Sequence, residues 1–117
     1  MENNRQVEDR IVELTTRGQL KLFLKDNPYT IVKASATWCG PCKRSTPFFM
    51  QIFNEKVPKH IKLVKLDVDE GDDLASYLRI KSMPTYIHFF EGEPKEIYSS
   101  GDKDAIINFF KSILRYY

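Results

Sequence analysis

The chain has little of what marks several classes of protein. Its 117 residues include only 5 Gly, 6 Pro and 2 Cys, too few for a collagen-like, low-complexity or disulfide-stapled chain. The 18 Lys and Arg nearly balance the 16 Asp and Glu, and no basic run exceeds the pair Lys43-Arg44. The longest apolar stretches, such as residues 86–90, fall well short of the roughly 18 residues of a membrane span. Neither nucleic acid nor a membrane is therefore expected as a partner.

The composition supports one folded domain. Hydrophobic residues make up 42% of the chain, and its aromatics comprise 8 Phe, 6 Tyr and 1 Trp, so disorder is excluded and a core can form. We expect a single domain over residues 1–117, with residues 1–10 as a loosely ordered N-terminal extension. Those ten residues are polar and of mixed charge, unlike a secretory signal. The sequence therefore favours a cytoplasmic location.

Strand-like and helix-like segments alternate along the chain. An apolar segment at residues 11–14 precedes a possible N-cap at Thr15-Thr16 and an amphipathic helix that ends at Asn27-Pro28. The later segments predict strands at 30–35, 61–68, 85–90 and 95–100, helices at 41–56 and 69–78, and a last helix capped by Asp102. Residues 91–94 are predicted to connect a closing hairpin. Pro47, inside the second helix, predicts a kink.

This order, β-α-β-α-β-α-β-β-α, predicts an α/β fold. Strands that alternate with helices form a mainly parallel sheet covered on both faces, and the closing hairpin adds an antiparallel edge.

The two cysteines, Cys39 and Cys42, form a C-x-x-C pair. In a reducing compartment such a pair is catalytic or metal-binding rather than structural. Zinc fits poorly, because a structural site needs four ligands and the only histidines are the distant His60 and His88. Cys39 precedes a helix whose N-terminus stabilises negative charge, so the pKa of its thiol should fall below the free value of about 8.5. Cys39 is then the nucleophile, and Cys42, one turn later, resolves the mixed disulfide.

A longer set of motifs resembles the thioredoxin family. Residues 38–43, Trp-Cys-Gly-Pro-Cys-Lys, resemble the active-site motif of that family, and Ser35-Ala36-Thr37-Trp38 resembles its cytosolic eukaryotic members. Pro47, Met83-Pro84-Thr85 and Ser100-Gly101 also match, so the resemblance runs from Ile11 onward. It implies a thioredoxin fold, a central mixed sheet of about five strands flanked by about four helices.

Around the cysteines, each residue has an expected role. Gly40 would let a substrate backbone approach, and Pro41 would stiffen the first helical turn without needing an N–H partner. Trp38 would form a flat apolar wall beside the sulfur or be a partly buried core aromatic; both are compatible.

The resemblance also implies a substrate-binding lip. Met83, Pro84 and Thr85 would form it, with a cis bond before Pro84, and Gly101 would add surface contacts. The alternative is an ordinary trans turn, since only about 5–6% of X-Pro bonds are cis in general.

One position departs from the family pattern. The family usually has a buried aspartate where this chain has Lys33. Either the Lys33 ammonium reaches water, or Lys33 is buried near Lys65, and burial and the like charge both lower its pKa. In the second case a neutral Lys33 could accept the proton of Cys42, and a charged one would stabilise the thiolate and raise the reduction potential.

The resulting prediction is a protein-disulfide reductase. By resemblance it takes electrons from an NADPH-dependent thioredoxin reductase, binds no cofactor or metal, and works as a monomer on disulfide-containing proteins. One alternative is an oxidase or isomerase whose potential is raised by Lys33. Another is a binding module that uses the fold as a partner surface.

Overall fold

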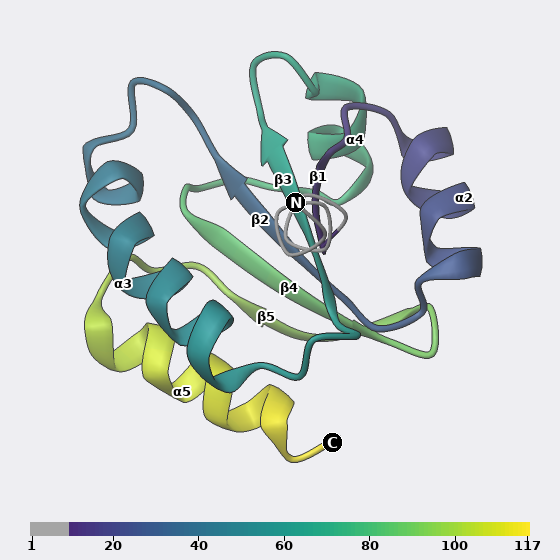
Figure 1. The fold of residues 1–117 in the computed structure, drawn as a ribbon. Coiled ribbons are helices and arrows are strands. Elements are labelled where there is room, and N and C mark those ends of the chain that lie inside the picture. Colours follow the sequence, from purple (N-terminus) through teal and green to yellow (C-terminus); the bar gives the residue numbers. More distant parts are fainter. Residues whose placement is uncertain (1–9) are drawn as a thin grey trace, which may run out of the picture.

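The structure, a computed structural model, describes residues 10–117 and contains one five-stranded mixed sheet with strand order β1-β3-β2-β4-β5 (Figure 1). The elements in chain order are β1 (Ile11–Glu13), α2 (Arg17–Asp26), β2 (Thr30–Ser35), α3 (Gly40–Lys56), β3 (Lys62–Asp67), α4 (Asp72–Tyr77), β4 (Thr85–Phe90), β5 (Glu93–Tyr98) and α5 (Lys103–Leu114). Strands β1, β3 and β2 are parallel, and β4 and β5 are antiparallel. The predicted α/β order and mixed sheet are confirmed.

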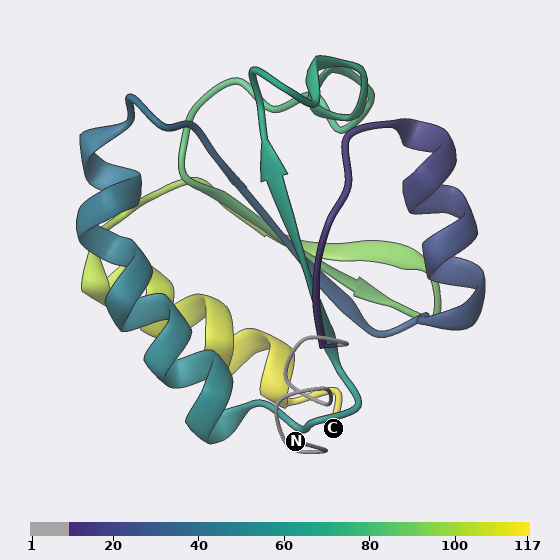
Figure 2. The same cartoon turned by 45° about the horizontal axis from the view of Figure 1, so that its top comes forward.

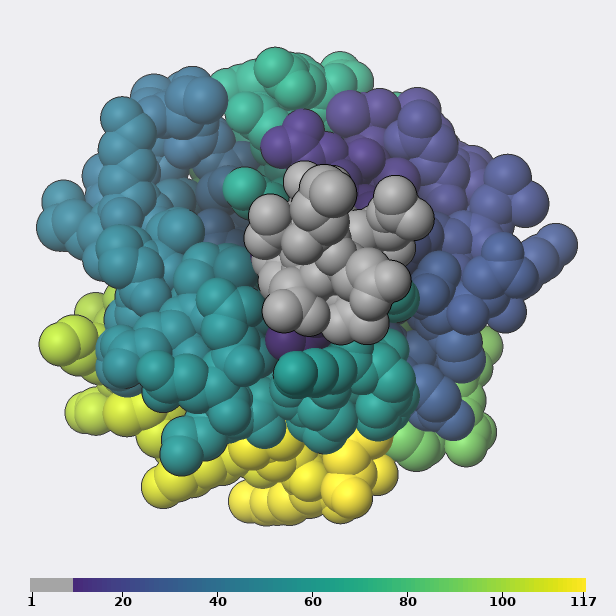
Figure 3. Space-filling model, viewed as in Figure 1, coloured from purple at the N-terminus to yellow at the C-terminus, as the bar shows by residue number. Residues whose placement is uncertain are grey.

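Helices cover both faces of the sheet (Figure 2). Strand side chains alternate between the faces, so Ile31 packs with Phe49 of α3 and Ile106 of α5, whereas Val32 packs with Leu20 of α2 on the opposite face. The space-filling view shows α3 and α5 meeting along one side of the molecule, away from α2 (Figure 3). Among residues 10–117, no helix combines the length and the apolar character needed to cross a bilayer.

The hairpin loop between β4 and β5 is shorter than predicted. Only Glu91 and Gly92 separate the strands, with φ of 55° and 80°, and positive φ at both central residues is the pattern of a tight type I′ turn. Pro94 therefore lies inside β5 rather than in the connection. It is tolerated there because β5 is an edge strand, where a missing N–H costs little.

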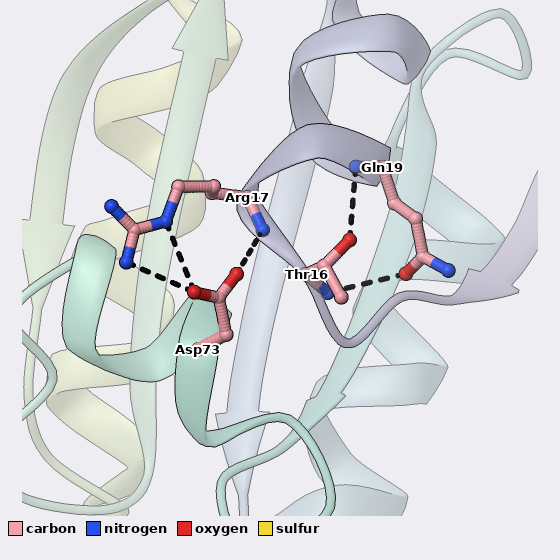
Figure 4. Close-up of polar contacts among 4 residues, drawn as sticks. All are labelled: Thr16, Arg17, Gln19 and Asp73. Atoms are coloured by element: carbon pink, nitrogen blue, oxygen red, sulfur yellow. Dashed lines mark hydrogen bonds and ion pairs between the residues drawn. The ribbon is translucent and has the colours of Figure 1, made fainter.

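The start of α2 is tied to α4 (Figure 4). Thr16 is the N-cap, as predicted: its hydroxyl accepts from the Gln19 N–H at 3.1 Å, and the Gln19 side chain accepts from the Thr16 N–H at 3.2 Å. The Arg17 guanidinium and backbone N–H both bind the Asp73 carboxylate. These contacts fix α2 against α4 on the face opposite α3.

Helices α3 and α5, which cover the other face of the sheet, begin where the sequence predicts. The N-cap of α5 differs from the prediction in its hydrogen bonding. Helix α3 includes Pro47, and the kink predicted there stays a prediction. Asp102 occupies the N-cap position of α5, but its side chain makes no capping hydrogen bond.

Arg10 is the only described residue of the expected N-terminal extension; the rest of that expectation lies outside the described residues. Its guanidinium lies 3.9 Å from the centre of the Phe53 ring and donates to four carbonyl oxygens, those of Ile61, Phe53, Val57 and Pro58. The last carbonyls of a helix lack intrahelical partners. Arg10 therefore satisfies the end of α3 and the turn into β3.

Candidate active site

The cysteine pair lies at the N-terminus of α3. Cys39 is the N-cap residue, and Cys42 follows in the first turn. The two form a disulfide with a Cα–Cα distance of 5.3 Å, and both are buried. The Cys42 N–H donates to the Cys39 Sγ at 3.2 Å. The sulfur of Cys39 thus takes the place of a capping oxygen, where unpaired N–H groups and the helix dipole favour a negative charge.

A second segment approaches Cys39 from the loop before β4. The Met83–Pro84 peptide bond is cis, as the resemblance implied. The Met83 carbonyl oxygen lies 3.7 Å from the Cys39 Sγ. The Thr85 hydroxyl donates to the Ser82 carbonyl at 2.7 Å and pairs with the Ser99 hydroxyl at 2.8 Å. These bonds fix the backbone of this segment beside the Cys39 sulfur.

Gly101 brings a third segment to the site. A Cβ at this position would lie 3.2 Å from the Pro41 carbonyl oxygen and 3.6 Å from the Pro84 Cγ. The loop before α5 therefore packs closely against both other segments, and a side chain would push them apart. Gly40 is under a weaker constraint: its Cβ would meet only the mobile end of the Arg44 side chain, at 3.1 Å.

Trp38 lies on the surface next to the disulfide. Its side chain is 65% exposed, so the interpretation as a partly buried core aromatic is wrong. Its indole N–H donates to the Asp69 carboxylate at 2.8 Å, and the Asp67 carboxylate accepts from the Asp69 N–H at 2.9 Å. Asp67 and Asp69 belong to an acidic run, and sequence reasoning missed Asp69 as the residue that orients Trp38. The proximity of the run to the carboxyl end of a parallel strand was the available signal.

Lys33 is buried in the sheet. Only 4% of it is exposed, which agrees with the buried interpretation. It pairs in register with Lys65 of β3 and Tyr86 of β4, and its Nζ lies 6.0 Å from the centre of the Phe49 ring. Burial, and secondarily the positive charge of Lys65, lower the pKa of Lys33 to about 8.

A buried pair of hydroxyls lies beside Lys33, and sequence reasoning missed it. Ser45 donates to the Cys42 carbonyl at 3.2 Å, so the Tyr86 hydroxyl donates to the Ser45 Oγ, 3.4 Å away. Tyr86 is fully buried and stacks on Phe49. Burial raises the pKa of its phenol, which keeps the hydroxyl protonated. The only signal in the sequence was a hydroxyl residue on the apolar face of α3.

The two histidines lie elsewhere. His88 is fully buried, and its Nε2 pairs with the Tyr117 hydroxyl at 2.8 Å. His60 is exposed, and its ring contacts Tyr29 and Tyr117 edge-on. Within residues 10–117, no three His, Cys, Asp or Glu residues gather as a metal site would require.

Comparison with known proteins agrees with this geometry. The family model named Thioredoxin matches residues 11–112. The putative thioredoxin-5 of Dictyostelium discoideum is 36% identical over 102 residues, which cover 87% of this chain and 97% of that protein. Human thioredoxin is 35% identical over 81% of this chain and 89% of its own length.

Among solved structures, the oxidised form of mitochondrial thioredoxin 3 from Saccharomyces cerevisiae superposes with a TM-score of 0.77. It is 27% identical and covers 87% of this chain and 94% of its own. Both proteins share the layered sheet described above. With a cysteine pair at disulfide distance at the start of α3, the chain belongs to the thioredoxin family and is a protein thiol–disulfide oxidoreductase.

Proposed function

We propose that this oxidoreductase works in the reducing direction, with Cys39 as the nucleophile and Cys42 as the resolving thiol. The position of Cys39 as N-cap of α3 carries the assignment. In the dithiol form, the same N–H groups would hold the Cys39 thiolate that attacks a substrate disulfide. Cys42 is 2% exposed, which suits a thiol that reacts only with the adjacent mixed disulfide.

Substrate proteins would bind across the three segments that meet at the disulfide. The Met83 carbonyl, beside the cis Pro84 and next to the Ser82 carbonyl that Thr85 binds, is placed to pair with an extended substrate backbone, and Gly101 leaves that approach open. The exposed ring of Trp38 adds an apolar wall. Gly40 and Pro41 complete the motif by keeping the first turn of α3 short and rigid.

The wider setting follows from the family. We propose that the chain is a single domain and a monomer that carries electrons in the cytoplasm, where it contributes to redox homeostasis. A thioredoxin reductase would recycle its disulfide with NADPH, with no cofactor bound to this chain. The yeast relative is mitochondrial, so fractionation of the source cells with antibodies against the protein is the test of location.

The buried Lys33 supports a second candidate. A positive charge beneath the disulfide stabilises the thiolate, which raises the reduction potential toward oxidase or isomerase chemistry. The gap between thioredoxin, at about −270 mV, and protein disulfide isomerase, at about −180 mV, corresponds to only about 4 kcal/mol. A single buried charge can supply much of this difference.

The deciding experiment is the reduction potential of the Cys39–Cys42 couple, measured at pH 7 against glutathione, together with an insulin reduction assay. A potential near about −270 mV with rapid turnover supports the reductase, and one more than about 60 mV higher with slow reduction supports the oxidase or isomerase.

Single substitutions test the cysteine roles. Cys42→Ser should trap a mixed disulfide on Cys39, and Cys39→Ser should trap none, because only Cys39 attacks the substrate. If the double serine variant keeps full biological activity, the protein instead works as a binding module.

A further inference from the structure

The buried amine of Lys33 stands out among the polar groups of the core. Among residues 10–117 its Nζ makes no hydrogen bond or ion pair, and it keeps only a small exposed surface. Its register neighbour on one side is a second lysine, Lys65. A buried charge normally has a partner that offsets its desolvation. Structural stability therefore gives no reason for a lysine at this position.

The surroundings of Lys33 place it under α3, on the helix face that carries Cys42. The inward face of α3 runs through Cys42, Ser45, Phe49 and Phe53, so Phe49 lies two turns below Cys42 on the same stripe. The Lys33 Nζ lies over the Phe49 ring. Tyr86, opposite Lys33 in the sheet, reaches the first turn of α3 through Ser45. No charged group of α3 or α5 stands between Lys33 and the disulfide on this face.

The titratable groups around Lys33 are few. Strand β3 contributes Lys65 and, two residues further along the same face, Asp67, whose carboxylate accepts from the Asp69 and Glu70 N–H groups; β1 contributes Glu13 beyond Lys65 in register. Strand β4 contributes Tyr86, whose pKa is raised by burial. Helix α3 contributes the cysteines, and α5 contributes only apolar residues, Ile106 and Phe109. Of these groups, the cysteines alone change charge during the reaction near neutral pH.

We propose that Lys33 is a redox-linked proton site, which binds a proton when the disulfide is reduced and releases it when the disulfide forms again. The inference rests on thiol–disulfide exchange at Cys39 and Cys42. With the disulfide closed, the charge that acts on Lys33 is the like charge of Lys65. Reduction places a thiolate on Cys39, and this negative charge favours the ammonium form of Lys33. Lys33 is a positioning residue, since its charge affects the reacting sulfurs and it forms no bond with the substrate.

The step balances in atoms and charge. The reduced protein carries a Cys39 thiolate, a Cys42 thiol and a Lys33 ammonium. The thiolate attacks one substrate sulfur and breaks the substrate disulfide; Cys42 then attacks Cys39, closes the protein disulfide and releases the second substrate sulfur. Two electrons pass to the substrate. Above about pH 8, where Lys33 is a neutral amine in the oxidised protein, the two protons that convert the substrate sulfurs to thiols equal the two that leave Cys42 and Lys33.

The linkage has a measurable signature. In a two-electron couple, each proton taken up on reduction lowers the potential by about 30 mV per pH unit. Above the pKa of the Cys39 thiol, a dithiol without a linked base takes up one proton, so its slope is about 30 mV per pH unit. Above about pH 8, where Lys33 is neutral in the oxidised protein, uptake of a second proton by Lys33 should bring the slope to about 60 mV per pH unit.

The experiment measures the reduction potential of the full chain from pH 6 to 10 for the wild type and three variants. Lys33→Met, which keeps the length but cannot titrate, should lose the steeper limb above about pH 8. Lys65→Met should keep it but move its onset to higher pH, because the repelling charge is gone. Lys25→Met, an exposed lysine of α2 on the other face, should give a curve parallel to that of the wild type.

Parallel curves for Lys33→Met and the wild type would overturn the proposal, as would a Lys65→Met curve without a shifted onset. The Lys65 variant, at an exposed position, keeps the test valid if Lys33→Met does not fold. This test can fail independently of the proposed function. The reduction potential at pH 7 decides between reductase and isomerase, whereas the change in the slope of potential against pH concerns Lys33 alone.

Discussion

His88 should make the protein sensitive to acid. It is 0% exposed on β4, its Nε2 is paired with the Tyr117 hydroxyl, and its Nδ1 has no hydrogen-bond partner among residues 10–117. Burial lowers the pKa of His88 from 6.5 to about 4. Between these values the unfolded chain binds a proton that the folded protein excludes, so stability rises with pH across this window and is lost as the pH falls through it.

The size of this loss of stability follows from the lowered pKa of His88. The lowering of the pKa corresponds to about 3 kcal/mol of stability, fully present above pH 6.5 and lost by about pH 4. Between pH 7 and 4.5 the loss should be about 2.5 kcal/mol. Aromatic rings of Phe90, Tyr116 and Tyr117 surround His88. Its register partner Glu96 accepts a hydrogen bond from the Tyr116 hydroxyl, and burial remains the cause that lowers the pKa of His88.

The assay is urea unfolding of the oxidised wild type and of His88→Phe at pH 7 and at pH 4.5. The stability difference between the two proteins should shift by about 2.5 kcal/mol in favour of the variant at the lower pH, while other titrating groups contribute equally and cancel. Tyr117→Phe is the matched control. The loss of its hydrogen bond should lower the unfolding free energy by about 0.5–1.5 kcal/mol, but the variant keeps His88 and therefore the same loss of stability at low pH. An unchanged difference between wild type and His88→Phe at the two pH values would refute the argument.

Four further substitutions test other parts of the structure. Arg10→Met should lower the unfolding free energy by about 2–4 kcal/mol, since a charged donor to several carbonyls is lost, with an unchanged urea m-value. Asp69→Ala should cost less than about 1 kcal/mol but lower the fluorescence anisotropy of Trp38, the only tryptophan; equal anisotropy would mean that Asp69 does not hold the ring. Gly101→Ala should destabilise by about 1–3 kcal/mol because the Cβ meets backbone, whereas Gly18→Ala, with nothing within 4 Å, should stabilise by about 0.5–1 kcal/mol.

Local sequence patterns were sufficient for the order of the elements. Helix faces with a period near 3.6 and β-branched strands are signals carried by neighbouring residues, and they located β2, α3 and β4 closely. The hairpin loop shows where such signals fail. Pro94 was read as part of the turn, but whether a proline can sit in a strand depends on which edge of the strand is paired, and pairing is a tertiary property.

The residues of the site also divide into those that local sequence patterns reveal and those that only contacts across the fold reveal. Cys39, Cys42 and Pro84 are recognisable because the spacing of the motif is fixed along the chain. Asp69 and Tyr86 were missed because their roles are contacts across the fold: an indole N–H 31 residues away for Asp69, and a serine hydroxyl 41 residues away for Tyr86. A carboxylate in an acidic run and an aromatic in a strand have many ordinary uses, so neither draws attention without the structure.

Lys33 and His88 show how differently the fold treats two buried bases. At pH 7 the imidazole of His88 is neutral in both the folded and the unfolded chain, because its pKa moves from 6.5 to about 4, so its burial there costs almost nothing. Lys33 has a pKa of about 8, lowered from 10.5. It is therefore mostly charged in both states at pH 7, and the folded protein carries nearly the whole penalty, about 3 kcal/mol. Stability would recover only as the pH rises from about 8 through 10.5. Of these two bases, the one that destabilises the protein at neutral pH is the one that lies beneath the reacting sulfurs, where a buried charge acts on the chemistry.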